Sequence, residues 1–346
     1  MKQTIVSSLP RERMSPANAR FRLDIGSLLA THDMSWSDGP PPHWTRGAPI
    51  GNGDLGAVVY GHPDSLSFAL GKTDVWEMMP TDQSDTYPDQ SFAEIRRTYL
   101  EDAPDAYEEL MAETVRRQTD DHKESHLTTC GTLRLRLDTG VSPGGCAMKL
   151  PLREGIAHVT YINRRIRALV SREYEALIIE FDRGEPVPQS PSFSDSVPAD
   201  QVFWEFFRGA SEATGETFSV SAEDPVCVVT QPLGQGASFA VGIAWDGEAR
   251  GFSDSLPGQA HGVLNELQSR KLYFYATAAS SRETDDPASL CRERLKRLLG
   301  TDPDDVIASH RGWWDDYWKR GLCAVGDEAV EKHYYRSLYL CGSMFE

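Results

Sequence analysis

The 346-residue sequence has no apolar run long enough to cross a membrane, and residues 1–8 contain no hydrophobic core of a secretory signal. Its four asparagines all lie outside Asn-x-Ser/Thr acceptors, so no site for an N-linked glycan is present. These absences predict no membrane partner. They also favour a cytoplasmic protein, provided that the true start is not upstream of Met1.

The sequence has few basic residues relative to acidic ones: it contains 35 Lys and Arg residues and 52 Asp and Glu residues, so the net charge is -17. A surface of this sign argues against nucleic acid as the main partner. The six cysteines form no Cys-x-x-Cys pair, and in a chain of this length they are interpreted as buried thiols rather than a disulfide framework. We expect no cofactor.

One glycine-rich string, Gly51-Asn52-Gly53-Asp54-Leu55-Gly56, satisfies the dinucleotide-binding pattern and, with Val58, the protein-kinase pattern. A dinucleotide site requires a helix directly after the third glycine, whereas residues 57–63 indicate a short strand and a turn. The kinase alternative finds a lysine at Lys72 but no HRD or DFG motif. We therefore interpret the string as a β-turn whose glycines take positive φ or admit another backbone.

Short strands separated by polar turns dominate the sequence up to about residue 280. Leu133, Leu135 and Leu137 alternate with arginines, which is the period-two pattern of a half-buried strand. Further strands are expected within residues 48–77, 156–162, 166–171, 176–181, 202–207, 226–230, 238–245 and 271–278. Many short strands with few helices between them indicate an antiparallel sandwich. A helical segment is inserted at about residues 92–118, where Pro104 divides it.

Helical sequence follows the strands. The pairs Asp286-Pro287 and Asp302-Pro303 each place a cap and an N1 proline before a helix, and these helices end near Gly300 and Lys319. A third helix begins near Asp327 and continues to residue 346 with an apolar stripe that requires a partner. We therefore expect the chain to be cut off at the entrance to a second, helical domain.

Several strings, taken in order, resemble family 95 glycoside hydrolases. Trp44 and residues 48–57 resemble the opening of their N-terminal β domain, and residues 70–76 resemble the string that follows it. Later matches lie at residues 130–133, 165–181, 310–318 and 334–340, so the resemblance spans roughly residues 35–346. The resemblance rests on the order of these strings rather than on the glycine string alone.

The resemblance implies a mainly β fold, with an antiparallel β supersandwich and a helical linker that leads into an (α/α)6 barrel, most of which is missing. We assign residues 1–34 to an N-terminal extension, 35–280 to the sandwich, 281–324 to the linker and 325–346 to the first barrel helix. The family hydrolyses terminal sugars, typically α-L-fucose, with inversion, which requires an acid and a base carboxyl. Both would lie beyond Glu346, so we expect no catalytic residue in this chain.

Four residues within the matched strings are candidates for contact with the oligosaccharide or glycoconjugate substrate: Asn52, Asp54, Asp74 and Trp76. The two aspartates could face the sugar pocket of the barrel, with Asn52 as a polar contact. The alternative interpretation, which we prefer, is that the aspartates hold turns through hydrogen bonds from their side chains to the backbone.

Two other groups of residues admit a functional and a structural interpretation. The aromatic residues Trp313, Trp314, Tyr317 and Trp318 could stack on a sugar, but i, i+4 spacing is more typical of a helix face packed on the sandwich. His122, His126 and Cys130 have helical spacing but not the HExxH order of zinc proteases. They lie where a helix passes into a strand, which would separate the ligands. We expect no metal site.

Two further functions remain open from the sequence. The chain could be a complete carbohydrate-binding or interaction sandwich with no enzymatic activity. It could also belong to a phosphorylase of the related sandwich-plus-barrel type, which would differ only in the missing barrel. The oligomeric state is not indicated by any pattern in the sequence.

Overall fold

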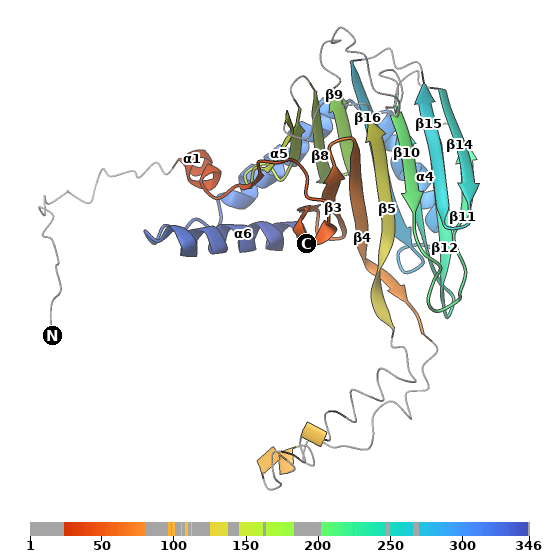
Figure 1. Cartoon of the computed structure of the whole chain (residues 1–346), viewed down its shortest axis with the longest axis horizontal. Helices are drawn as coiled ribbons and strands as arrows, with labels where there is room; N and C mark the ends of the chain where they lie inside the picture. Colours follow the sequence, from red (N-terminus) through yellow and green to blue (C-terminus); the bar gives the residue numbers. More distant parts are fainter. Residues whose placement is uncertain are drawn as a thin grey trace, which may run out of the picture.

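The computed structural model describes residues 24–79, 125–137, 145–161, 164–182, 202–223, 225–246, 250–265 and 270–344, and single residues between 96 and 112. Within these ranges, two antiparallel sheets form a sandwich and helices follow at the C-terminal end (Figure 1). The predicted fold class, mainly β with an antiparallel sandwich, is confirmed. The predicted insertion at residues 92–118 lies mostly outside the described residues, and the single residues described there are helical.

The two sheets differ in size and both combine strands from distant parts of the chain. The nine-stranded sheet has the order β1 (Met34–Trp36), β6 (Ala147–Leu150), β7 (Ala157–Thr160), β8 (Arg165–Ser171), β9 (Ala176–Asp182), β16 (Lys271–Ser280), β13 (Ala237–Trp245), β12 (Val226–Gly234) and β11 (Ser219–Glu223). The seven-stranded sheet has the order β14 (Arg250–Leu256), β15 (Gln259–Asn265), β10 (Val202–Phe207), β5 (His126–Leu137), β4 (Ser65–Glu77), β3 (Leu55–His62) and β2 (Ala48–Gly51).

Each strand expected from the sequence is present, but five others were missed: β1, β6, β11, β14 and β15. Three of these, β1, β11 and β14, are edge strands. An edge strand is held mainly by backbone pairing on one side, so it can be short or polar, as the exposed β11 is. The first described residues also contain a short helix, α1 (Ile25–Ala30), capped by Asp24, and a 3-10 turn, η1 (Trp44–Arg46).

The main hydrophobic core lies between the sheets, and a second one lies under the helices. Strand β9 is buried along its whole length because it contributes to both. Leu177 and Ile179 belong to the main core, whereas Ala176 and Ile178 alternate with them and contact the helical layer. Covering both faces of a strand produces a continuous apolar run rather than strict alternation.

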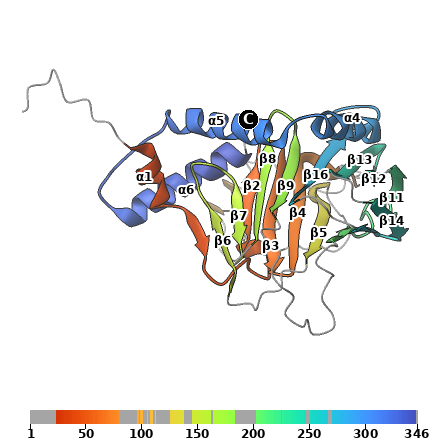
Figure 2. The ribbon, with the colours of Figure 1, turned by 90° about the horizontal axis from the view of Figure 1, so that it is seen from above.

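Three helices complete the described fold: α4 (Pro287–Leu299), α5 (Pro303–Trp318) and α6 (Glu328–Met344). Helices α4 and α5 follow one another along one side of the sandwich, and α6 lies near β2 (Figure 2). Asp286 and Asp302 accept hydrogen bonds from backbone amides at the starts of α4 and α5, so both predicted caps are confirmed. No helix among the described residues is long and apolar enough to span a membrane.

The aromatic residues of α5 join the helices to the sandwich. Trp314 and Trp318 are each 1% exposed and belong to the main core. Trp314 stacks on Tyr339 of α6, with ring centroids 5.0 Å apart, and Trp318 Nε1 donates to the Leu152 carbonyl at 2.9 Å. The packing interpretation of this helix face is confirmed for these two side chains, because buried rings cannot stack on a sugar.

Candidate functional site

The glycine string forms the turn between β2 and β3. Asn52 Oδ1 accepts hydrogen bonds from the backbone amides of Asp54 at 3.0 Å and Leu55 at 2.8 Å. Gly53 has φ of 100°, and a Cβ on Gly51 would overlap the Ser343 carbonyl of α6. Both predicted uses of the glycines, positive φ and close approach of another backbone, are confirmed. Strand β3 continues through Gly56, so the helix that a dinucleotide site requires is not formed there.

A buried lysine lies at the end of the main core, next to this turn. Leu66, Phe68 and Leu70 of β4 point into the core at alternate positions, and Lys72 is the next residue in that alternation. The register of β4 with β5 shifts after Leu70, so regular pairing ends at this point. The Lys72 side chain is only 2% exposed. A buried ammonium requires compensating charge.

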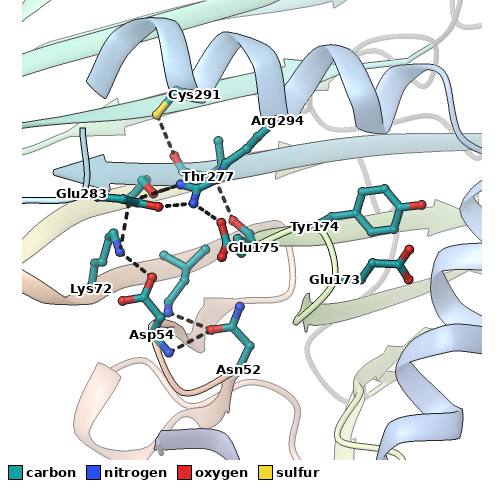
Figure 3. Close-up of polar contacts among 12 residues, drawn as sticks. Asn52, Asp54, Lys72, Glu173, Tyr174, Glu175, Thr277, Glu283, Cys291 and Arg294 are labelled. Carbon is teal, nitrogen blue, oxygen red and sulfur yellow. Dashed lines mark hydrogen bonds and ion pairs between the residues drawn. The ribbon is translucent and has the colours of Figure 1, made fainter. Parts of the chain in front are cut away.

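Three carboxylates supply that charge to Lys72: Asp54, Asp74 and Glu283. Figure 3 shows the contacts of Lys72 with Asp54 and Glu283. Asp54 forms a hydrogen-bonded ion pair with it, and Lys72 Nζ lies 3.3 Å from Asp74 Oδ1 and 3.4 Å from Glu283 Oε2. The Ser280 hydroxyl donates to the other oxygen of Asp74 at 2.6 Å. These residues come from the β2–β3 turn, from β4, and from the end of β16 with the segment after it.

A second cation, Arg294 of α4, extends the group. Its guanidinium pairs with Glu283 and with Glu175 of the β8–β9 turn, and it donates to the Ala278 carbonyl at 2.9 Å. Arg294 is 7% exposed. We call these six residues the carboxylate cluster: Asp54, Lys72, Asp74, Glu175, Glu283 and Arg294.

The carboxylate cluster has an excess of negative charge, since four carboxylates face two cations. Burial disfavours the ammonium of Lys72, but the hydrogen bond and charge of Asp54 outweigh it and raise the pKa of Lys72. Burial raises the pKa of Glu283, as do Asp54 and Asp74, although Lys72 opposes them. Burial lowers the pKa of Arg294. Lys72 is therefore held in its charged form.

The hydrogen bonds of the carboxylate cluster suit a structural junction better than acid-base chemistry. A general base must be free to take a proton from water. Asp54 uses one oxygen for Lys72 and the other for the Thr73 hydroxyl at 2.7 Å, and Asp74 accepts from Ser280. The described residues contain no group of three or more His, Cys, Asp or Glu side chains placed to hold a metal ion. His122 lies outside the described residues.

The structure brings together only some of the four candidate residues. Asp54 and Asp74 share Lys72, while Asn52 directs its amide to the Ser171 carbonyl of β8 at 2.9 Å. Trp76 lies further along β4, where its Nε1 donates to the Thr73 carbonyl at 3.0 Å. Their contact with a sugar stays a prediction.

Three members of the carboxylate cluster were missed by the sequence interpretation: Glu175, Glu283 and Arg294. Asp74 and its partner Ser280 are 206 residues apart, and Glu175 and Arg294 are 119 apart. No local pattern marks such partners. The one available signal was Lys72, which interrupts the inward apolar positions of β4.

Comparison with known proteins finds a family that is similar to part of the chain. Residues 36–178, which contain the β2–β3 turn, Lys72 and β8, match the N-terminal domain of glycosyl hydrolase family 65. This region is therefore similar to the N-terminal domain of a glycosyl hydrolase. The motifs resemble family 95, whereas this match is to family 65. The two comparisons agree only in that both families are glycosyl hydrolases.

Two particular proteins are similar to the chain. Alpha-L-fucosidase 2 of Arabidopsis thaliana is 36% identical over 59 residues, which cover 17% of this chain and 7% of the fucosidase. A putative kojibiose phosphorylase from human microbiome has a similar structure, with a TM-score of 0.51 and 9% identity over 90% of this chain and 41% of the phosphorylase. The second likeness concerns the fold alone. The chain spans less than half the length of either protein.

Proposed function

We propose that this chain is the N-terminal, non-catalytic part of a carbohydrate-active enzyme that resembles family 95 glycoside hydrolases. The match of residues 36–178 to a glycosyl hydrolase N-terminal domain is the observation that carries this proposal. The whole enzyme would hydrolyse a terminal, α-L-fucose-like glycosidic bond of an oligosaccharide or glycoconjugate with inversion. Its acid and base carboxyls would belong to a helical barrel that these 346 residues do not include.

The contacts among the family-like strings support an architectural role for them. The Gly53 amide donates to the Ser343 carbonyl at 2.9 Å, and the Tyr339 hydroxyl donates to the Pro49 carbonyl at 2.8 Å. Trp314 stacks on the same Tyr339. The glycine turn, the tryptophan helix and the last helix thus meet in one interface. We infer that these strings hold the linker and α6 in a set position against the sandwich.

The absence of a free acid and base pair in the carboxylate cluster also supports a non-catalytic role. Its aspartates are paired with Lys72 and hydrogen-bonded to Thr73 and Ser280. A glycosidase needs one carboxyl that gives a proton and another that activates water. The cluster instead holds the β2–β3 turn, β4 and α4 together.

The proposal is tested by assaying two forms of the protein with 4-nitrophenyl α-L-fucopyranoside. The 346-residue chain should release no nitrophenol, whereas a form extended through any continuing reading frame should release it. Turnover by the 346 residues alone would contradict a non-catalytic role. Adding inorganic phosphate to the extended form separates the alternatives, because a phosphorylase would form a sugar 1-phosphate. An extended form inactive on a panel of glycosides would favour a binding sandwich.

A further inference from the structure

Asn52 differs from the other asparagines of the chain because a glycine follows it. The other three precede Ala19, Arg164 and Glu266. In an Asn-Gly pair the backbone nitrogen of the glycine can approach the side-chain amide carbon of the asparagine, since glycine has no Cβ to obstruct it. Attack by that nitrogen is the first step of deamidation. The β2–β3 turn therefore contains a chemically labile amide.

Deamidation at this position needs only water as a second reactant. The Gly53 nitrogen loses its proton and bonds to Cγ of Asn52, the bond from Cγ to Nδ2 breaks, and Nδ2 leaves with that proton as ammonia. Water then opens the resulting five-membered succinimide at either carbonyl, which gives aspartate or isoaspartate. No oxidation or reduction takes place. The rate therefore depends on how freely the Gly53 nitrogen can reach the Asn52 side chain.

In the folded chain both reacting groups are engaged in hydrogen bonds. The Gly53 amide donates to the Ser343 carbonyl of α6 at 2.9 Å. Asn52 Nδ2 donates to the Ser171 carbonyl at 2.9 Å, and its Oδ1 accepts from two backbone amides of its own turn. Asn52 is also 4% exposed, which limits the access of water. The nucleophile and the leaving group are thus both held away from reaction.

The acceptor that holds the Gly53 amide belongs to a separate element. Ser343 lies in the last turn of α6, where backbone carbonyls have no partner within the helix. Two further hydrogen bonds seat this end of α6. The Tyr339 hydroxyl donates to the Pro49 carbonyl at 2.8 Å, and Arg172 Nη2 donates to the Gly342 carbonyl at 2.7 Å. The protection of the turn therefore depends on the docking of α6.

Undocking of this end of α6 would release the Gly53 amide without unfolding the sandwich. Local openings of a terminal element cost less free energy than global unfolding does. We propose that Asn52 is a latent deamidation site, which the docking of α6 keeps closed.

The modification acts in one direction only. Both products lack the Nδ2 donor, so a carboxylate oxygen would oppose the Ser171 carbonyl, and two acceptors form no hydrogen bond. Isoaspartate also adds a carbon to the main chain of a turn that is already crowded, since a Cβ on Gly51 would overlap the Ser343 carbonyl. The modified turn cannot restore its contacts with β8 and α6. Repeated undocking of α6 thus leads to permanent loosening of this interface.

Peptide mass spectrometry of the 346-residue chain, incubated at mildly alkaline pH, tests the proposal. It measures how fast the Asn52 amide is replaced by a carboxyl group. The same chain unfolded in guanidinium chloride gives the unprotected rate. The folded chain should react on the order of a hundred-fold more slowly, because only its open fraction is reactive. The readout is a mass, so it is independent of any glycosidase activity.

Two matched variants separate undocking of α6 from unfolding of the whole chain. Tyr339→Phe removes the donor to the Pro49 carbonyl, and should speed deamidation of the folded chain roughly ten-fold. Tyr161→Phe removes a buried hydroxyl that donates to the Pro63 carbonyl, also at 2.8 Å, at the opposite end of β3. It should leave the rate unchanged, since α6 stays docked.

Three results would overturn the proposal. The first is a folded chain that deamidates at Asn52 as fast as the unfolded chain, and the second is a rate that Tyr339→Phe leaves unchanged. The third is equal acceleration by Tyr339→Phe and Tyr161→Phe, which would assign the exposure of the turn to global unfolding. Circular dichroism checks that the variants fold. Arg172→Met, which removes the donor to the Gly342 carbonyl, should act like Tyr339→Phe and replaces it if that variant is unfolded.

Discussion

The side-chain amide of Asn52 donates a hydrogen bond of 2.9 Å to the carbonyl oxygen of Ser171, and so ties the β2–β3 turn of one sheet to the end of β8 in the other. Asn52 is 4% exposed, and its Oδ1 holds two amides of its own turn. One buried side chain thus shapes the turn and joins the two sheets. This contact explains the asparagine of the glycine string by architecture, without a ligand.

Asn52→Ala should therefore lower the free energy of unfolding by about 2–4 kcal/mol, because three hydrogen bonds are lost and buried partners remain unsatisfied. Urea unfolding measures the change. Asn52→Ser keeps an oxygen acceptor at the turn but loses the amide donor, so its loss should be smaller. A change below about 0.5 kcal/mol for Asn52→Ala, as at ordinary surface sites, would contradict the role assigned to this side chain.

Lys72→Met should destabilise the chain by about 3 kcal/mol at pH 7, because the carboxylate cluster would keep its negative charges with only Arg294 to balance them. Urea unfolding at several pH values measures this. The difference in unfolding free energy between Lys72→Met and the parent should become smaller as the pH falls towards about 4, where protonation of the carboxylates relieves their repulsion. Lys296→Met, which changes an exposed lysine of α4, should be nearly neutral. A difference in unfolding free energy that does not change with pH would contradict this electrostatic account.

The raised pKa of Lys72 also predicts that the folded chain loses stability at alkaline pH. The folded state holds the proton of Lys72 more tightly than the unfolded state does. The resulting stability is complete below the ordinary lysine value near 10.4 and is lost as the pH rises through the folded pKa. The parent should lose more stability than Lys72→Met above that pH, as thermal unfolding in alkaline buffers would detect. Equal losses of stability by the parent and by Lys72→Met would contradict the prediction.

Arg208→Met should cost about 3–5 kcal/mol of unfolding free energy, because it leaves the buried carboxylate of Glu77 without its cation. Arg208 Nη2 lies 2.9 Å from Glu77 Oε1, and these side chains are 4% and 2% exposed. The exposed pair of Lys319 and Asp316 is closer, at 2.7 Å. Lys319→Met should nevertheless cost less than about 1 kcal/mol. Equal losses of unfolding free energy by Arg208→Met and Lys319→Met, measured by urea unfolding, would show that burial does not decide how much an ion pair stabilises the chain.

His310→Phe should flatten the pH dependence of stability between about pH 6.5 and 4. The folded pKa of about 4 lies below the ordinary value, mainly because of burial, so unfolding takes up a proton in this range. The contribution is complete above pH 6.5 and is lost as the pH falls towards 4, by about 3 kcal/mol. Asp246, whose pKa burial raises to about 6, acts in the opposite direction in both proteins and cancels in the difference. Identical pH profiles would contradict the prediction.

Much of the fold could be predicted from the sequence, since its signals act over a few residues. The alternating leucines of β5 and the Asp-Pro starts of α4 and α5 are local patterns, and the structure bears them out. The polar edge strand β11 was missed because its stability comes from pairing with β12 rather than from its own side chains. Sequence patterns report burial, and an exposed edge has little of it.

The candidate site was predictable only in part. Asp54 and Asp74 were singled out by the resemblance, but Glu283 lies in the turn after β16, and Arg294 lies on a helix whose own pattern indicates only an amphipathic segment. Their meeting with Lys72 depends on how α4 crosses β13 and β16. The same holds for Arg172 of the β8–β9 turn and His310 of α5, which line one cavity although the sequence does not place their elements side by side.

The sequence by itself determined that this protein is an antiparallel β-sandwich with capped C-terminal helices, and that its glycine string is a turn. Periodicity, caps and turn residues act within one element, so they are readable without the partner elements. Only the tertiary structure decided that Lys72 is buried among carboxylates and that the ring of His310 is buried with its Nε2 unpaired. Some of these contacts, such as Glu283 with Lys72 and Glu175 with Arg294, join residues far apart in the sequence, which only packing brings together.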